Sequence, residues 1–162
     1  MNTPRDASLL LIRELRTFQR EILLFPDDVM VWKTLPGITN SAGNLALHVS
    51  GNLRHFVGAA IGGIPYARNR EDELGRQAGT REEIVAALEA AIIAVGASLA
   101  NSTLEDEFPE RPAGYRMRTG VFLMHLCVHT GYHLGQVGYL RRALTADSRT
   151  SAALPLQDIA MP

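Results

Sequence analysis

Apolar residues recur at steps of three and four along four long stretches of the chain. This spacing places them on one face of a helix, and no stretch alternates between apolar and polar residues as a half-buried strand does. In the first stretch, for example, Leu9, Ile12 and Leu15 begin such a stripe. The pattern predicts four helices, over about residues 3–24, 40–62, 80–101 and 119–144. Four long helices without strands indicate an all-α protein, a four-helix bundle.

Residues that start and stop helices agree with these ranges. Asn40 or Ser41 can cap the second helix, and the glycines and proline of residues 62–65 end it. Thr80 and Glu83 have the spacing of a capping box, in which each side chain bonds the other residue's backbone amide. The start of the third helix is therefore predicted at Thr80.

The connecting segments differ in character. Residues 29–40 are long for a bundle loop, so we expect them to pack against the body of the protein. Residues 66–79 are charged and contain glycine, and we expect an exposed loop in which Arg68 and Glu73 are solvated. Residues 104–118 contain prolines, a glycine and mixed charge, which is compatible with a turn or a short extended pair.

The length and composition fit one domain. The 162 residues include 46% apolar and 20% charged residues, which is typical of a globular protein with its own core. The predicted domain is the whole chain, 1–162, with a core over about residues 5–145 and an irregular C-terminal tail, 146–162, that lacks periodicity.

Charge and cysteine content exclude several classes of protein. A net charge of −1 gives no electrostatic footprint for nucleic acid or an anionic membrane. The single cysteine excludes an internal disulfide framework, and no apolar run approaches the roughly 20 residues that span a bilayer. The N-terminus does not have the pattern of a signal peptide, so a cytoplasmic location is predicted.

All five histidines lie on two of the predicted helices, His48 and His55 on the second and His125, His129 and His133 on the fourth. The last three are spaced by four residues, so they lie on one stripe of the helix, beside its apolar face. Buried imidazoles need partners, because an unpaired buried polar group costs about 1–3 kcal/mol. One interpretation is a shared metal ion, and the other is a set of structural histidines that are hydrogen-bonded or solvated.

Two segments of the chain resemble the DinB/YfiT-like superfamily of metalloenzymes. In that superfamily a histidine early in the second helix is followed, far downstream, by an H-x3-H-x-G-Q signature on the fourth. Residues 45–58, LALHVSGNLRHFVG, and residues 125–136, HLCVHTGYHLGQ, carry this pair of features, and the charged residues 66–74 also look like the family's segment at that place. The resemblance extends over about residues 5–145.

The resemblance implies a four-helix bundle that binds a divalent metal, commonly in a homodimer. Carried over by position, the metal ligands are His48, His129 and His133. His125 does not match a ligand position and is interpreted as a neighbour, while His55 lies about 10 Å along the helix from His48, too far to share its ion. Zinc is the first choice for such a ligand set, and nickel and iron(II) also suit imidazole.

Several other residues are candidates for the surroundings of the metal. Asn52 and Gln136 are placed to hold an imidazole by its second nitrogen, although Gln136 could equally bond a neighbouring helix. In an up-and-down bundle the second and fourth helices run parallel, so residues 29–40 and 104–118 are expected at one end, around the mouth of the site. From these connectors, the side chains expected to line the mouth are Trp32, Tyr115, Arg116 and Arg118. Such an aromatic and cationic lining would suit an anionic small molecule. The alternative is that the arginines face water.

Three functions are compatible with these features. The first is a metal-dependent transferase or hydrolase acting on a small molecule, because characterised relatives in the superfamily include thiol-dependent S-transferases and isomerases. The second is a non-catalytic metal-binding or stress-responsive helical dimer, in which the ion only joins helices. The third is a metal-free helical dimer. No side chain in the sequence is identified as a catalytic base, and three histidines with an open coordination position would favour the first function.

Overall fold

The computed structural model of the chain describes residues 3–100, 104–151 and 156–160, and it is all-α. Four main helices form the body of the protein: α1 (Thr3–Leu23), α2 (Ala42–Leu53), α4 (Arg81–Leu99) and α5 (Thr119–Thr145). A short helix, α3 (Arg70–Gly75), lies outside them. Within the described residues there is no strand beyond a single antiparallel bridge between Glu107 and Arg118. The predicted four-helix bundle is therefore confirmed.

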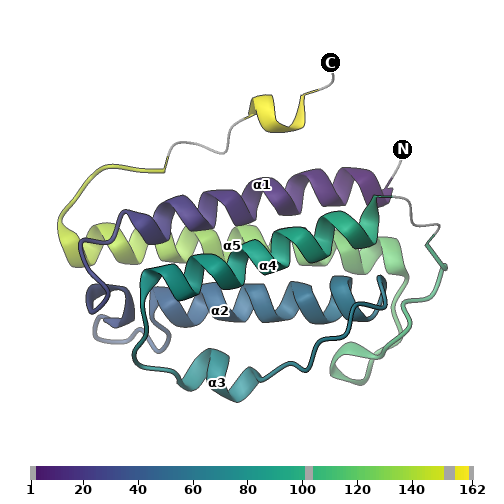
Figure 1. Cartoon of the computed structure of the whole chain (residues 1–162), viewed down its shortest axis with the longest axis horizontal. Helices are drawn as coiled ribbons and strands as arrows, with labels where there is room; N and C mark the ends of the chain where they lie inside the picture. Colours follow the sequence, from purple (N-terminus) through teal and green to yellow (C-terminus); the bar gives the residue numbers. More distant parts are fainter. Residues whose placement is uncertain (1–2, 101–103, 152–155, 161–162) are drawn as a thin grey trace.

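The four helices pack around one core, with α1 against α4 and α5, and α2 against the same two helices (Figure 1). The apolar stripe predicted for the third helix supplies part of this core. The stripe predicted for the first helix is partly wrong, because Leu15 is fully buried whereas Leu9 is 40% exposed. The largest fully buried apolar side chains of the core come from all four helices and the end of the α1 segment: Leu11, Leu15, Phe18, Ile22, Phe25, Leu53, Ile84, Leu88, Leu99, Leu123 and Leu126.

Helices α2 and α5 run antiparallel, so the expectation of an up-and-down bundle is wrong. Phe56, which follows the end of α2, contacts Phe122 near the start of α5, with ring centroids 5.1 Å apart. His48, which comes earlier in α2, contacts His129 and His133, which come later in α5. The reason is the connection between α2 and α4, which returns along the outside of α2 and carries α3 (Figure 1). Helix α4 consequently starts at the same end as α2.

The second helical segment changes its hydrogen-bond pattern near its end. After α2 the chain continues as a π-helix, η2 (Arg54–Ala59), in which the Ala60 amide donates to the His55 carbonyl at 2.9 Å. The predicted helix over 40–62 is thus helical over most of its length, but its last part is wider than an α-helix. Such π segments occur often at functional sites.

Capping follows the sequence signals at both α2 and α4. The Thr80–Glu83 capping box is confirmed, and Ser41 caps α2 through a second box with Asn44. The Asn44 amide group also donates to the backbone carbonyls of Glu73 at 3.1 Å and Arg76 at 2.8 Å. One side chain therefore begins α2 and fastens α3 beside it.

The connector before α2 packs against the bundle, and the tail after α5 is partly described. Trp32 of the short 3₁₀ helix η1 (Met30–Trp32) packs on Gly43, and its indole Nε1 donates to the Gly79 carbonyl at 2.8 Å. After α5, residues 146–151 are irregular, and Leu156–Ile159 form a 3₁₀ turn, η4. The rest of the predicted tail, residues 152–155 and 161–162, lies outside the described residues.

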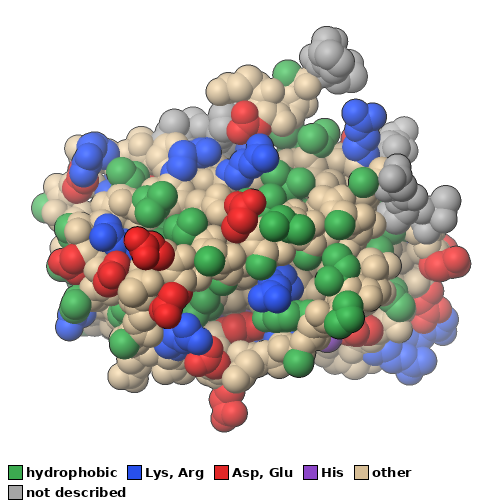
Figure 2. All heavy atoms as spheres, in the orientation of Figure 1, with side chains coloured by type: hydrophobic (Ala, Val, Ile, Leu, Met, Phe, Trp, Pro, Cys, Tyr) green, Lys and Arg blue, Asp and Glu red, His purple; other side chains and the backbone are tan. Residues whose placement is uncertain are grey.

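The surface carries mixed charge on the face made mostly by α1 and α4. In Figure 2 acidic and basic side chains are interspersed there, and only a small area of histidine is visible. Little histidine surface is therefore exposed on this face. Among the described helices, none is both long enough and apolar enough to cross a membrane.

Candidate metal centre

Three histidines from two helices converge between α2 and α5. The side chains of His48, His129 and His133 each offer a nitrogen within 4.8 Å of the other two. The ring of His48 lies 5.3 Å from that of His129 and 5.4 Å from that of His133, measured between centroids. The four-residue spacing on α5 places His129 and His133 one turn apart on one face, and the antiparallel α2 brings His48 opposite them.

The spacing of the nitrogens fits a shared metal ion. His129 Nε2 and His133 Nε2 are 3.1 Å apart. Two imidazole nitrogens at a zinc–nitrogen distance of about 2.0–2.1 Å are separated by about 3.3 Å in a tetrahedral site, and by about 2.9 Å when cis in an octahedral one. The observed separation lies between these values, so the pair could chelate one ion without rearrangement.

His129 and His133 are neutral at physiological pH, as metal ligands must be. Burial, followed by the nearby His133, His48 and His125 rings and the charge of Arg68, lowers the pKa of His129 from 6.5 to about 4. Burial also lowers the pKa of His133, against the opposite effect of its hydrogen bond to Gln136. Each ring therefore keeps a lone pair for an ion.

Polar neighbours hold two of the rings by Nδ1. Gln136, predicted to hold an imidazole by its second nitrogen, has its Oε1 at 2.7 Å from His133 Nδ1. Nδ1 of His48 lies 3.3 Å from the Glu73 carboxylate and 3.2 Å from the Arg68 guanidinium. In both rings Nε2 is thereby left to face the cluster.

Glu73 and Arg68 were expected to be solvated, and this expectation is wrong. Glu73 is only 5% exposed, and Arg68 donates to it from Nε at 2.9 Å and from a terminal nitrogen at 2.8 Å. Although burial works to raise its pKa, the hydrogen bonds from His48 and Arg68 and the charge of Arg68 hold the pKa of Glu73 below its ordinary value. Because α3 lies against α2, a residue from a charged connector becomes part of the histidine cluster's surroundings.

Asn52, His125 and His55 do not join the three converging nitrogens. Asn52 lies one turn after His48 and is buried, but its Oδ1 has no hydrogen-bond partner within the described part of the chain. His125 is exposed and its ring stacks on that of His129 with centroids 5.9 Å apart, so it is a neighbour of the cluster. His55 lies in η2, beyond the end of α2, and its Nε2 is 3.0 Å from the Glu110 carboxylate.

A pocket of about 620 Å³ opens beside His133. It lies between residues 35–40 and the later half of α5, and no Asp, Glu, Lys or Arg among the described residues lines it. The apolar wall of the pocket includes Leu35, Ile38, Leu45 and Leu140. His133 and Gln136 form the polar edge of the pocket, on the side of the histidine cluster.

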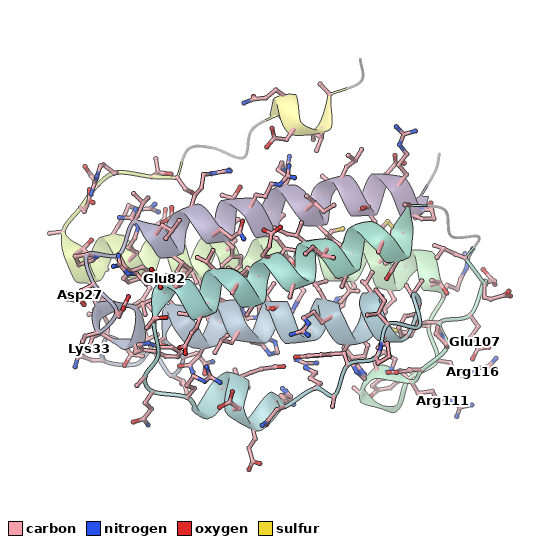
Figure 3. The ribbon with its side chains drawn as sticks, viewed as in Figure 1. Asp27, Lys33, Glu82, Glu107, Arg111 and Arg116 are labelled. Atoms are coloured by element: carbon pink, nitrogen blue, oxygen red, sulfur yellow. The ribbon has the colours of Figure 1, made fainter. Side chains whose placement is uncertain are left out.

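The residues expected to line a cationic mouth lie elsewhere. Figure 3 shows Lys33, in the 29–40 connector, at one end of the bundle and Arg111 and Arg116 at the other. Arg116 pairs with Glu107, Arg118 pairs with Asp106 at 3.2 Å, and Tyr115 is largely exposed. Because α2 and α5 are antiparallel, residues 104–118 cannot meet residues 29–40, and Trp32 is instead engaged with Gly43 and Gly79.

The fold and the site together define a class of protein: an all-α helical bundle with a three-histidine cluster between its second and last long helices. The chain belongs to the DinB family, whose family model matches residues 37–148, from the connector before α2 to just beyond α5. Neither a comparison with curated proteins nor one with solved structures gave a match. The residues matched include all three histidines of the cluster.

Proposed function

We propose that this protein binds one divalent transition metal ion through His48, His129 and His133 and is a metal-dependent enzyme acting on a small molecule. The reaction class is a transferase of the thiol S-transferase type or a hydrolase. Zinc is the first choice for three imidazoles, and nickel or iron(II) are the alternatives.

The observation that carries the proposal is an incomplete ligand set made of three histidines. Among the described residues, the group that could hold an ion contains three histidines and no fourth protein ligand. A structural zinc site normally has four protein ligands, whereas catalytic sites keep an open position. A bound divalent ion with an open position supplies a Lewis acid to the reacting group.

The pocket next to His133 supports a small-molecule substrate. Its volume of about 620 Å³ lies within the usual range for small-ligand sites, roughly 300–1,000 Å³. The wall made by Leu35, Ile38 and Leu140 suits an apolar body, and His133 and Gln136 at the polar edge suit a reacting head. A substrate seated there would place its head at the histidine cluster.

X-ray absorption at the metal edge of the purified protein tests this function against a purely structural ion. We expect three imidazole nitrogens and at least one additional light atom from solvent, because the described ligands leave a position open. A spectrum that requires four protein ligands would support the alternative, a non-catalytic metal-binding dimer.

We also propose that the protein is a homodimer that pairs through the outer face of α5. Five apolar side chains on this face, each at least half exposed, are Val121, Met124, Val128, Tyr132 and Tyr139. Tyr132 and Tyr139 also line the pocket beside His133, so the partner copy would border the opening of that pocket. No charged residue lies between Thr119 and Tyr139, so α5 adds no charge to this face before Arg142, whose guanidinium lies over the Tyr139 ring. An exposed apolar patch of this kind is typical of an interface, and a symmetric pair buries the same patch on both copies.

A further inference from the structure

Glu73 is a buried carboxylate that reaches the metal centre from outside the bundle. It lies on α3, in the connection between α2 and α4, and its Oε2 is 3.3 Å from His48 Nδ1. An isolated buried carboxylate is costly, so its partners indicate what it does there. Those partners are His48 and Arg68, since Arg68 donates to both carboxylate oxygens.

The surrounding residues are arranged to bring this carboxylate against α2. A Cβ built on Gly51 would lie 1.9 Å from Glu73 Oε1, so only glycine at this position leaves room for the carboxylate. Asn44 fastens the backbone of α3 at Glu73 and Arg76. The close approach therefore depends on several separate features of α2 and α3.

The hydrogen bonds of His48 decide which of its nitrogens can bind an ion. If Nδ1 carries the proton, it donates to Glu73 and the lone pair of Nε2 faces the cluster. If Nδ1 accepts from Arg68, Nε2 carries the proton and cannot be a ligand. The Arg68 nitrogen is 2.8 Å from Glu73 Oε2 and 3.2 Å from His48 Nδ1, so its shorter, charge-assisted bond is to the carboxylate.

We propose that Glu73 is the positioning residue of the metal centre: its carboxylate accepts the Nδ1 proton of His48 and thereby directs the Nε2 lone pair to the ion. Arg68 holds the carboxylate in place by donating to both of its oxygens. The inference rests on the metal binding proposed above, and it assigns to α3 the role that a carboxylate behind a ligating histidine performs at metal sites.

The first test compares Glu73→Gln with Glu71→Gln, an exposed residue two positions away on the same helix. Zinc affinity of the folded chain is measured by competition with a chromophoric chelator. We expect Glu73→Gln to bind zinc about 10–100-fold more weakly than the wild type, because the glutamine removes the charge behind the imidazole. Glu71→Gln is expected to stay within about twofold.

A second variant moves the carboxylate without removing it. Gly51→Ala places a methyl group where Glu73 Oε1 lies, and alanine does not weaken the helix itself. We expect its zinc affinity to fall at least about tenfold. The matched control is Gly75→Ala on α3, where an added Cβ would have no heavy atom within 4 Å.

Nitrogen-15 NMR of the His48 ring in the metal-free protein gives a readout independent of affinity. We expect protonation at Nδ1 in the wild type and loss of this preference in Glu73→Gln. Equal zinc affinity in both test variants and their controls, or a wild-type ring protonated at Nε2, would overturn the inference. A wild-type protein that binds no zinc, nickel or iron(II) would instead contradict the proposed function itself.

Discussion

At the scale of residues, the two histidines of the cluster on α5 could be predicted from the sequence, but the partner of His48 could not. His129 and His133 are half-buried and neutral, and their Nε2 atoms are 3.1 Å apart. Their convergence follows from a four-residue spacing on one helix, which is why the sequence suffices to suggest it. The partner of His48 is a different matter, because Glu73 lies 25 residues further along the chain on another element.

Cys127, two residues before His129, shows that position along a helix alone does not create a reactive group. Burial, with a smaller effect from Glu14, raises the pKa of the Cys127 thiol from 9.0 to about 11. A raised thiol pKa means less of the reactive thiolate at a given pH, about 100-fold less here well below both values. We expect iodoacetamide to modify Cys127 at pH 8 about 100-fold more slowly in the folded protein than after unfolding in denaturant.

The same reaction on Cys127→Ala gives the background, since no other cysteine is present in the chain. Equal rates in the folded and unfolded protein would show that the thiol is not shielded.

At the scale of helices, the sequence determines the elements better than their directions. The capping box at Thr80 and Glu83 is a local pattern, and it predicted the start of α4 correctly. The direction of α5 relative to α2 depends on whether residues 60–80 turn back or run along the bundle, and either path is open to a connector of that length. In the folded chain the connector turns back along α2, where Asn44 bonds the backbone carbonyls of Glu73 and Arg76.

The error in direction explains the error in the predicted mouth of the site. Residues 29–40 do border the pocket beside His133, but residues 104–118 lie at the far end of the bundle (Figure 3). Since the lining lacks charged side chains within the described residues, the pocket suits an apolar substrate body rather than the anionic molecule expected from Arg116 and Arg118.

Helices α1 and α5 are joined by a buried ion pair, which makes a prediction about stability. Arg141 is fully buried, its Nε donates to Glu21 Oε2 at 2.6 Å, and its terminal nitrogens donate to the Asp147 and Arg149 carbonyls after α5. Arg141→Leu leaves the Glu21 carboxylate buried without a cation, with a hydrogen bond from the Ser151 amide remaining. We expect the free energy of unfolding, measured by urea titration, to fall by about 3–5 kcal/mol.

The double variant with Glu21→Leu removes both charges and provides the control for this pair. Since an apolar pair can replace a buried ion pair at little cost, we expect it to regain much of the lost stability. A double variant no more stable than Arg141→Leu would show that the tail contacts, rather than the unpaired carboxylate, account for the loss.

For the whole molecule, the outer face of α5 predicts the oligomeric state. Sedimentation equilibrium is expected to give twice the 17.7 kDa mass of one chain. Val128→Arg introduces a charge in the middle of the apolar face and should yield monomers with unchanged helix content. Ile93→Arg is the control, because Ile93 is 64% exposed on α4, away from the proposed interface. A wild-type mass of one chain would refute the dimer.

The metal content of the purified protein tests the central claim most directly. Metal analysis of the wild type is expected to give one divalent transition metal ion per chain. His48→Ala, His129→Ala and His133→Ala should each lose it, because each removes one of three donors, whereas His125→Ala should retain it. A wild type without stoichiometric metal, or a His133→Ala variant that keeps it, would contradict the account.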